Sequence, residues 1–270
     1  MSSKIELGLE PLAKHVMQRP WLATRLPAVV VGLTGGLWLL NSAWMLARRL
    51  QGRLLRTSTR CVGAAAGPPR LPPIVPPQLD QVQQRLYDSI VETRIKVVGR
   101  EALFDESGAL RGPWNAEVAS PALGQHLERL ATAIRTENSL EARLYEVAIL
   151  VVGVHWRSQF EWYAHEKLAR RAGVAEAALP LIRSAAPAEH LRGFLQPDEA
   201  AVYRLALELM TTKRVSAATY AATKAALGGD ERRMVDLCMT MGCYSAVSTI
   251  LNMFEVPLPP GAALPFPEIP

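Results

Sequence analysis

The stretch Ser158-Gln-Phe-Glu-Trp-Tyr-Ala-His-Glu-Lys-Leu-Ala-Arg-Arg-Ala172 has the spacing of an amphipathic helix. At roughly 100° per residue, its charged side chains gather on one arc and its apolar side chains on the opposite arc. Ser158, Glu161 and His165 fall inside the apolar arc. A Glu–His pair four residues apart usually makes a weak surface contact, whereas this pair is predicted to point into the core.

The same periodicity continues on both sides and predicts an all-helical domain from Asp80 onward. No stretch there shows the sustained period-two alternation of half-buried strands. Helices are expected over 80–99, 121–135, 140–155, 158–172, 175–184, 198–211, 216–227 and 231–254. Ser216 is predicted to cap one of them, while Gly173 and the pair Gly228-Gly229 are predicted to end two others.

Two of these helices are apolar nearly all round. No charged residue occurs from Val147 to Val154, and none from Leu237 to Phe254. The second run has 18 residues, which is long enough for a membrane span. It is interrupted by polar residues, Asn252 among them, so we interpret it as the central helix of a bundle or of an oligomer interface.

The first of these helices also contains an acid, Glu146. A lone carboxylate in an apolar helix is costly without a partner, and buried carboxyl and imidazole groups must pair or shift their pKa values. A structural pairing of Glu161 with His165 would meet that need without any function. Two buried acids and a histidine on neighbouring helices favour the alternative, an acid–base cluster of Glu146, Glu161 and His165.

Five short motifs follow one another along the chain: Gly112-Pro-Trp-Asn115, Ser120-Pro121, Glu146-Val-Ala-Ile-Leu150, Glu161-Trp-Tyr-Ala-His165 and Leu251-Asn-Met-Phe-Glu-Val-Pro257. In this order they resemble the carboxymuconolactone decarboxylase family, which shares the alkylhydroperoxidase D-like helical fold. The resemblance covers nearly all of 80–270 and says nothing about 1–79. It implies an alkylhydroperoxidase D-like bundle that assembles into a homo-oligomer.

The related alkylhydroperoxidase D enzymes relay protons through a Glu, a Cys-x-x-Cys pair and a His. The matching positions are Glu146 for the glutamate, Ser158 and Glu161 for the two cysteines, and His165 for the histidine. Disulfide chemistry needs two thiols, so the sequence excludes thiol peroxidase chemistry at this site. The glutamate and the histidine that the decarboxylase branch requires remain.

The resemblance implies acid–base decarboxylation of a small unsaturated lactone or carboxylic acid, with no metal and no other cofactor. His165 is the expected general acid, Glu161 would set its protonation and orientation, and Glu146 would transfer a second proton or position the others. Arg157 is a candidate for holding the substrate carboxylate, with a surface or subunit contact as the alternative. Further candidates for substrate contacts are Trp114, Trp156, Trp162, Ser158, His155 and Asn252.

Two other functions stay open, because one fold hosts several chemistries. The same acid–base cluster would also serve isomerisation, dehydration or lactone hydrolysis in secondary metabolism. Alternatively, the chain is a non-catalytic helical oligomer whose buried polar residues only specify packing.

The domain organisation follows from proline and charge. We expect an N-terminal extension over 1–66, a proline-rich linker over 67–79, the helical domain over 80–256 and a proline-rich tail over 257–270. Ten of the 30 Lys and Arg residues, but two of the 25 acids, precede residue 80. The helical domain therefore lacks the basic stripe of a nucleic-acid-binding protein. Cys61, Cys238 and Cys243 give neither a disulfide framework nor metal-ligand spacing.

Residues 26–47 carry no charge, and 22 residues are enough to span a bilayer. The arginine-rich segment after them has the composition of an organelle transit peptide. A membrane anchor, a targeting segment and an unstructured or spurious extension are three open interpretations. A cytoplasmic location is expected for the helical domain, since an anchor with more positive charge after it would leave the domain on that side.

Overall fold

The structure, a computed structural model, describes residues 69–267. The predicted extension 1–66, with its uncharged run 26–47, and the last three residues of the tail lie outside the described residues. Within 69–267 every regular element is a helix, and the β-type pairing is limited to the isolated bridges Phe104–Leu110 and Arg192–Leu195. The predicted all-helical class is confirmed for this part of the chain.

The described elements run in the following order: η2 (Pro76–Gln78), α3 (Gln81–Val98), α4 (Arg100–Leu103), α5 (Trp114–Ala119), α6 (Pro121–Thr136), α7 (Ala142–Trp156), α8 (Gln159–Ala172), η3 (Glu176–Ala178), α9 (Leu179–Arg183), η4 (Ala188–Leu191), α10 (Pro197–Thr212), α11 (Ala217–Ala226) and α12 (Glu231–Met253). The predicted helix over 175–184 is instead two short pieces, η3 and α9, because Pro180 sits in the first turn of α9. The sequence did not predict α4 and α5, which are too short to show a period.

The predicted helix ends follow from local chemistry. The Ser216 hydroxyl accepts a hydrogen bond from the backbone N–H of Thr219 at the start of α11. Gly173 ends α8 in the left-handed conformation, with φ of 96°. Gly228 and Gly229 follow α11 with positive φ values. All of these signals are confirmed.

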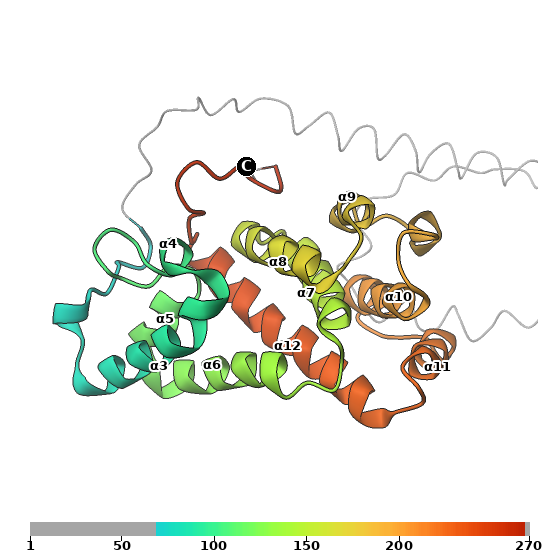
Figure 1. Ribbon diagram of the computed structural model, residues 1–270, viewed down its shortest axis with the longest axis horizontal. Helices are drawn as coiled ribbons and strands as arrows, with labels where there is room; N and C mark the ends of the chain where they lie inside the picture. The colour runs from blue at the N-terminus through green and yellow to red at the C-terminus, as the bar shows by residue number, and fades with distance from the viewer. Residues whose placement is uncertain (1–68, 268–270) are drawn as a thin grey trace, which may run out of the picture. The chain divides into compact units, whose positions relative to one another are not determined.

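Helices α7 and α12 form the centre of the described part. Ten consecutive residues of α7, from Leu144 to Gly153, are buried, and the helix packs against α8, α10 and α12. Figure 1 shows α12 running between α6 on one side and α7 and α8 on the other. By length and composition α12 could cross a membrane, but 44% of its apolar window is buried inside the protein. Its packing agrees with a central bundle helix.

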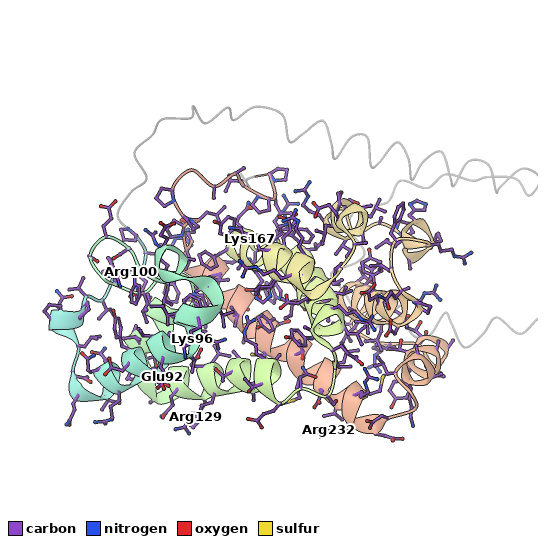
Figure 2. The ribbon with its side chains drawn as sticks, viewed as in Figure 1. Glu92, Lys96, Arg100, Arg129, Lys167 and Arg232 are labelled. Atoms are coloured by element: carbon purple, nitrogen blue, oxygen red, sulfur yellow. The ribbon has the colours of Figure 1, made fainter. Side chains whose placement is uncertain are left out.

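Two apolar clusters lie under these helices. The larger one contains side chains from α6, α7, α8, α9, α10 and α12, and it includes Phe266 of the C-terminal tail. The smaller one joins α3, α4 and α5 around Leu86, Ile90 and Leu103. Charged side chains such as Glu92 and Arg129 lie on the outer faces of α3 and α6 (Figure 2).

Candidate active site

The hairpin of α7 and α8 brings Glu146, Glu161 and His165 together; we call these three residues the acid–histidine cluster. The Nδ1 atom of His165 forms a 2.7 Å hydrogen bond with Oε2 of Glu146. The Nε2 atom of His165 lies 3.6 Å from Oε1 of Glu161. All three residues are at most 4% exposed. The predicted burial of Glu161 and His165 is confirmed, and the closer partner of His165 is Glu146.

A two-residue turn aligns the two helices. Arg157 adopts the left-handed conformation, with φ of 49°, and reverses the chain after α7. The N–H of Ser158 then donates to the carbonyl of Gly153 over 2.9 Å, and α8 starts at the next residue. This places the first turn of α8, with Glu161, against the end of α7, and places His165 one turn further along, beside Glu146.

Two residues that the sequence did not single out complete the surroundings of the cluster. Nη1 of Arg135, on α6, lies 3.9 Å from Oε1 of Glu146. Its Nη2 donates to the hydroxyl of Tyr244 on α12 over 3.1 Å. The ring of Tyr244 meets the ring of His165 edge-on, with centroids 4.8 Å apart. Neither position could be predicted from the sequence to lie beside the cluster, because Arg135 is an ordinary last-turn arginine and Tyr244 stands in an apolar run.

Burial controls the protonation of this site. Removal from water raises the pKa of Glu161 to about 7, although His165 and Arg135 act to lower it. The Glu161 carboxyl therefore exchanges a proton near neutral pH. Burial also raises the pKa of the Tyr244 hydroxyl above its usual value, so Tyr244 remains a neutral phenol that can accept from Arg135.

Several buried polar atoms around the cluster have no hydrogen-bond partner within residues 69–267. They include Nε of Arg135, Oγ of Ser158, Oε1 of Glu161 and Nε1 of Trp162. Most buried polar groups in folded proteins are paired. Three of these unpaired atoms belong to α8 or its N-cap and one to α6, and a polar molecule that reached any of them would supply the missing partner.

The other predicted substrate contacts lie elsewhere. Nη2 of Arg157 donates to the carbonyl of Pro267 over 2.8 Å, and its guanidinium lies 5.9 Å from the centre of the Phe266 ring, so Arg157 holds the tail. The amide of Asn252 donates to the Trp156 carbonyl over 2.6 Å, at the end of α7. These contacts leave both side chains outside the acid–histidine cluster.

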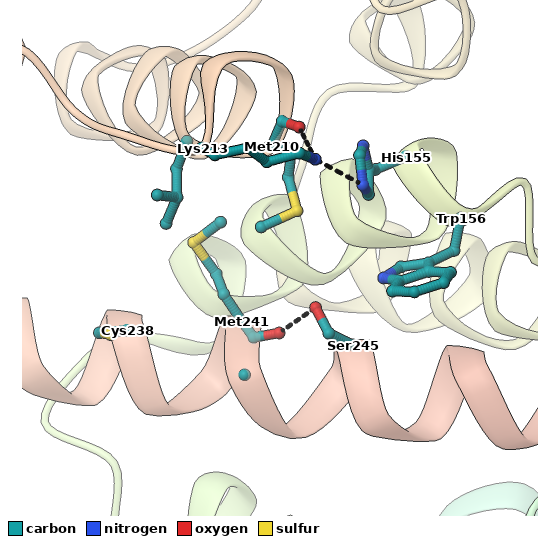
Figure 3. A pocket seen from close by; sticks show the side chains of 9 residues that line it. His155, Trp156, Met210, Lys213, Cys238, Met241 and Ser245 are labelled. Carbon is teal, nitrogen blue, oxygen red and sulfur yellow. Dashed lines mark hydrogen bonds between the residues drawn. The ribbon is translucent and has the colours of Figure 1, made fainter. Parts of the chain in front are cut away.

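His155 and Trp156 line a cavity of 350 Å³ on another side of α7, together with Met210, Met241 and Lys213 (Figure 3). Nζ of Lys213 donates to Nε2 of His155 over 3.1 Å. Burial and the neighbouring Lys213 lower the pKa of His155, so its imidazole is a neutral acceptor. None of the three cluster residues lines this cavity.

The remaining tryptophans differ in their surroundings. Trp114 packs on the small cluster of α3, α4 and α5. Trp162 is fully buried next to Glu161 on α8 and meets Phe266 edge-on at 5.8 Å. The side chain of Gln159 also bonds both backbone groups of Phe266, so the tail lies over the first turn of α8.

Within residues 69–267, no group of three or more His, Cys, Asp or Glu side chains is arranged to hold a metal ion. The two free cysteines of this range are on α12, with Cys238 exposed and Cys243 buried.

No family model matches the chain, and no curated protein matches its sequence. Solved structures match its fold. An uncharacterised peroxidase-related protein of Ralstonia eutropha with an alkylhydroperoxidase AhpD core has a TM-score of 0.55 at 12% identity, covering 72% of this chain and 93% of its own. A peroxidase-related protein of Silicibacter sp. has a TM-score of 0.55 at 12% identity, covering 74% and 96%.

A debrominase solved in complex with 2,3,4-tribromopyrrole has a TM-score of 0.53 at 10% identity, covering 69% of this chain and 90% of its own. At such identities the likeness shows the alkylhydroperoxidase D-like fold alone, and the reaction has to be argued from the site.

Proposed function

We propose that this protein is a cofactor-independent enzyme that decarboxylates a small unsaturated lactone or carboxylic acid at the acid–histidine cluster. One observation carries the proposal: each ring nitrogen of the buried His165 faces a buried carboxyl group, Glu146 or Glu161. The motifs that resemble those of carboxymuconolactone decarboxylases favour decarboxylation among the reactions that such a cluster can run.

In this proposal the two acids have different roles. Glu146 accepts the Nδ1–H of His165 and fixes the orientation of the imidazole. Nε2 of His165 then faces Glu161 and the substrate. Because its pKa is about 7, the Glu161 carboxyl can return a proton to Nε2 at neutral pH. Glu146 is thus the positioning residue, one of the two roles expected for it from the sequence, and it takes over the orientation of His165 that was expected of Glu161.

The reaction itself needs no added electron acceptor. The bond between the substrate carbon and its carboxylate breaks, carbon dioxide leaves, and the electron pair moves into the conjugated lactone carbonyl. His165 then protonates the carbon. The unpaired Nε of Arg135 is a donor for the oxyanion or for the substrate carboxylate, and this arginine replaces Arg157, which is occupied by the tail.

Substrate must reach a cluster whose three members are almost fully buried. The tail over the first turn of α8 is an irregular segment held by Gln159 and Arg157. We propose that its release opens the path to Glu161 and His165.

The test is turnover of 4-carboxymuconolactone by the full chain, with lactone absorbance and released carbon dioxide recorded together. Release of carbon dioxide supports the proposal. Loss of lactone absorbance without carbon dioxide would move the assignment to isomerisation or hydrolysis at the same cluster. If the folded protein turns over neither this lactone nor any of a panel of related unsaturated acids, the result would contradict the proposal and favour a non-catalytic helical oligomer.

A further inference from the structure

A second buried carboxyl group, Glu117 on α5, lies outside the acid–histidine cluster. Glu117 is 3% exposed, and its Oε2 atom has no hydrogen-bond partner among residues 69–267. It lines a cavity of 310 Å³ formed by α5, α6 and α12, to which the linker contributes Leu71. Apart from Ser120, the other lining residues are apolar or glycine, and Leu71, Leu127, Ile250 and Phe254 among them are partly buried.

Helix α6 approaches the backbone of α5 closely at Glu117. A Cβ atom added at Gly124 would lie 2.2 Å from the backbone oxygen of Glu117. Only glycine therefore allows α6 to pack directly on the backbone that carries Glu117. The linker is tied down as well, because Arg70 donates to the carbonyl of Met253 over 3.0 Å and forms an ion pair with Glu255.

Within the described part of the chain, no cationic side chain pairs with Glu117. Arg94 of α3 is committed to Glu128 of α6, through hydrogen bonds of 2.9 Å and 2.8 Å. Burial and the Glu128 carboxylate raise the pKa of Glu117 to about 8, against the influence of Arg94. On α12, burial and the acids Glu161 and Glu117 raise the pKa of the Cys243 thiol to about 12, so Cys243 adds no charge near neutral pH.

We propose that this cavity binds a small, uncharged and largely apolar molecule whose oxygen or nitrogen atom accepts a hydrogen bond from the Glu117 carboxyl. Among residues 69–267 the lining contains no Lys, Arg or His, so carboxylates and phosphates find no counter-charge there. The volume is at the lower end of the range of small-molecule pockets. A buried donor without a partner gains most from a ligand that supplies an acceptor. This site is separate from the proposed reaction and does not depend on it.

Three probes of similar size test the chemistry on the full chain at pH 6.5: acetophenone, which carries an acceptor; ethylbenzene, which lacks one; and benzoate, which is charged. Titration calorimetry should show acetophenone binding roughly 3- to 10-fold more tightly than ethylbenzene, as expected for one hydrogen bond. Benzoate should bind more weakly than both. Binding of benzoate in preference to acetophenone would overturn the proposal, as would the absence of binding by either neutral probe.

Variants identify the donor. Glu117→Leu should remove the preference for acetophenone, whereas Glu117→Gln should keep most of it because the amide still donates. Glu137→Leu makes the same change at an exposed acid after α6 and should leave binding unaltered. Ile250→Trp, which fills the cavity from α12, should weaken both neutral probes. Folding of each variant is checked by its thermal unfolding.

The pH dependence separates a donor from a structural acid. Above pH 8 the Glu117 carboxyl loses its proton and can no longer donate. The preference for acetophenone should therefore disappear in the wild type at pH 9.5 and persist in Glu117→Gln. An unchanged wild-type preference at pH 9.5, or equal acetophenone affinity of the wild type and a folded Glu117→Leu, would contradict the proposal.

Discussion

At the scale of single residues, Glu161 connects stability with function. Its pKa is about 7 in the folded protein, above its ordinary value of 4.5. Between these two pH values the folded state keeps a proton that the unfolded state releases. The raised pKa therefore stabilises the fold at low pH, and this contribution is lost as pH rises to about 7.

Glu161→Gln should remove this dependence. In urea unfolding at pH 8, the variant should be more stable than the wild type, by about 3 kcal/mol, and the difference should shrink towards pH 4.5. At the same time its turnover should fall, because the amide cannot return a proton to His165. A constant stability difference at every pH would show that the Glu161 carboxyl does not titrate as described.

Tyr244 is predicted to support the cluster through Arg135. Tyr244→Phe removes the acceptor for Nη2 of Arg135, which should cost about 1–2 kcal/mol of unfolding free energy. Tyr220→Phe is the matched control, since Tyr220 is 46% exposed on α11. If chemical denaturation gives equal losses for both variants, the Arg135–Tyr244 bond contributes nothing.

Helical periodicity could predict which residues of one helix are buried, and it did so for Glu161 and His165. It could not predict which residue of another helix meets them. The 2.7 Å bond from His165 to Glu146 and the approach of Arg135 depend on how α6, α7 and α8 pack. Periodicity likewise could not predict that Arg157 donates to Pro267, because the two residues are 110 positions apart in the sequence.

At the scale of elements, the tail and α8 act as a unit. Phe266 is 5% exposed and packs edge-on against Trp162, the neighbour of Glu161. Phe266→Ala should destabilise the protein by about 3–5 kcal/mol and speed hydrogen exchange at the first turn of α8. Phe194→Ala removes a ring that is 44% exposed and serves as the control. Unchanged exchange at Glu161 and Trp162 would show that the tail does not cover the site.

Helix length decides which elements could be predicted from the sequence. The long helices α6, α7 and α12 begin and end within about two residues of the ranges that periodicity predicts. Helix α5 spans six residues and gives no periodic signal, yet it carries Glu117 and one wall of the second cavity. The sequence therefore predicted the framework of the fold and missed the element on which the further site depends.

At the scale of the whole molecule, the outer face of α12 bears on assembly. Val235, Met239 and Met253 are each at least 50% exposed on this face, and no charge occurs between Leu237 and Phe254. Exposed apolar patches commonly mark interaction sites. We propose that this face is buried against a second copy of the chain, as the resemblance to oligomeric decarboxylases implies.

Met239→Glu places a charge in that face and should lower the molar mass found by light scattering. Val82→Glu makes a similar change at an exposed position of α3 and should leave the mass unaltered. A mass that is the same for wild type and Met239→Glu would exclude the α12 face as the interface.

In the proposed reaction His165 delivers the proton. We therefore compare the rate of carbon dioxide release from 4-carboxymuconolactone by the full-length wild type, His165→Ala and His126→Ala, where His126 is an exposed histidine on α6. We predict that a folded His165→Ala protein loses roughly 10²- to 10⁴-fold in rate, while His126→Ala retains it. Equal release by His165→Ala and the wild type would contradict the assignment of the acid–histidine cluster as the active site.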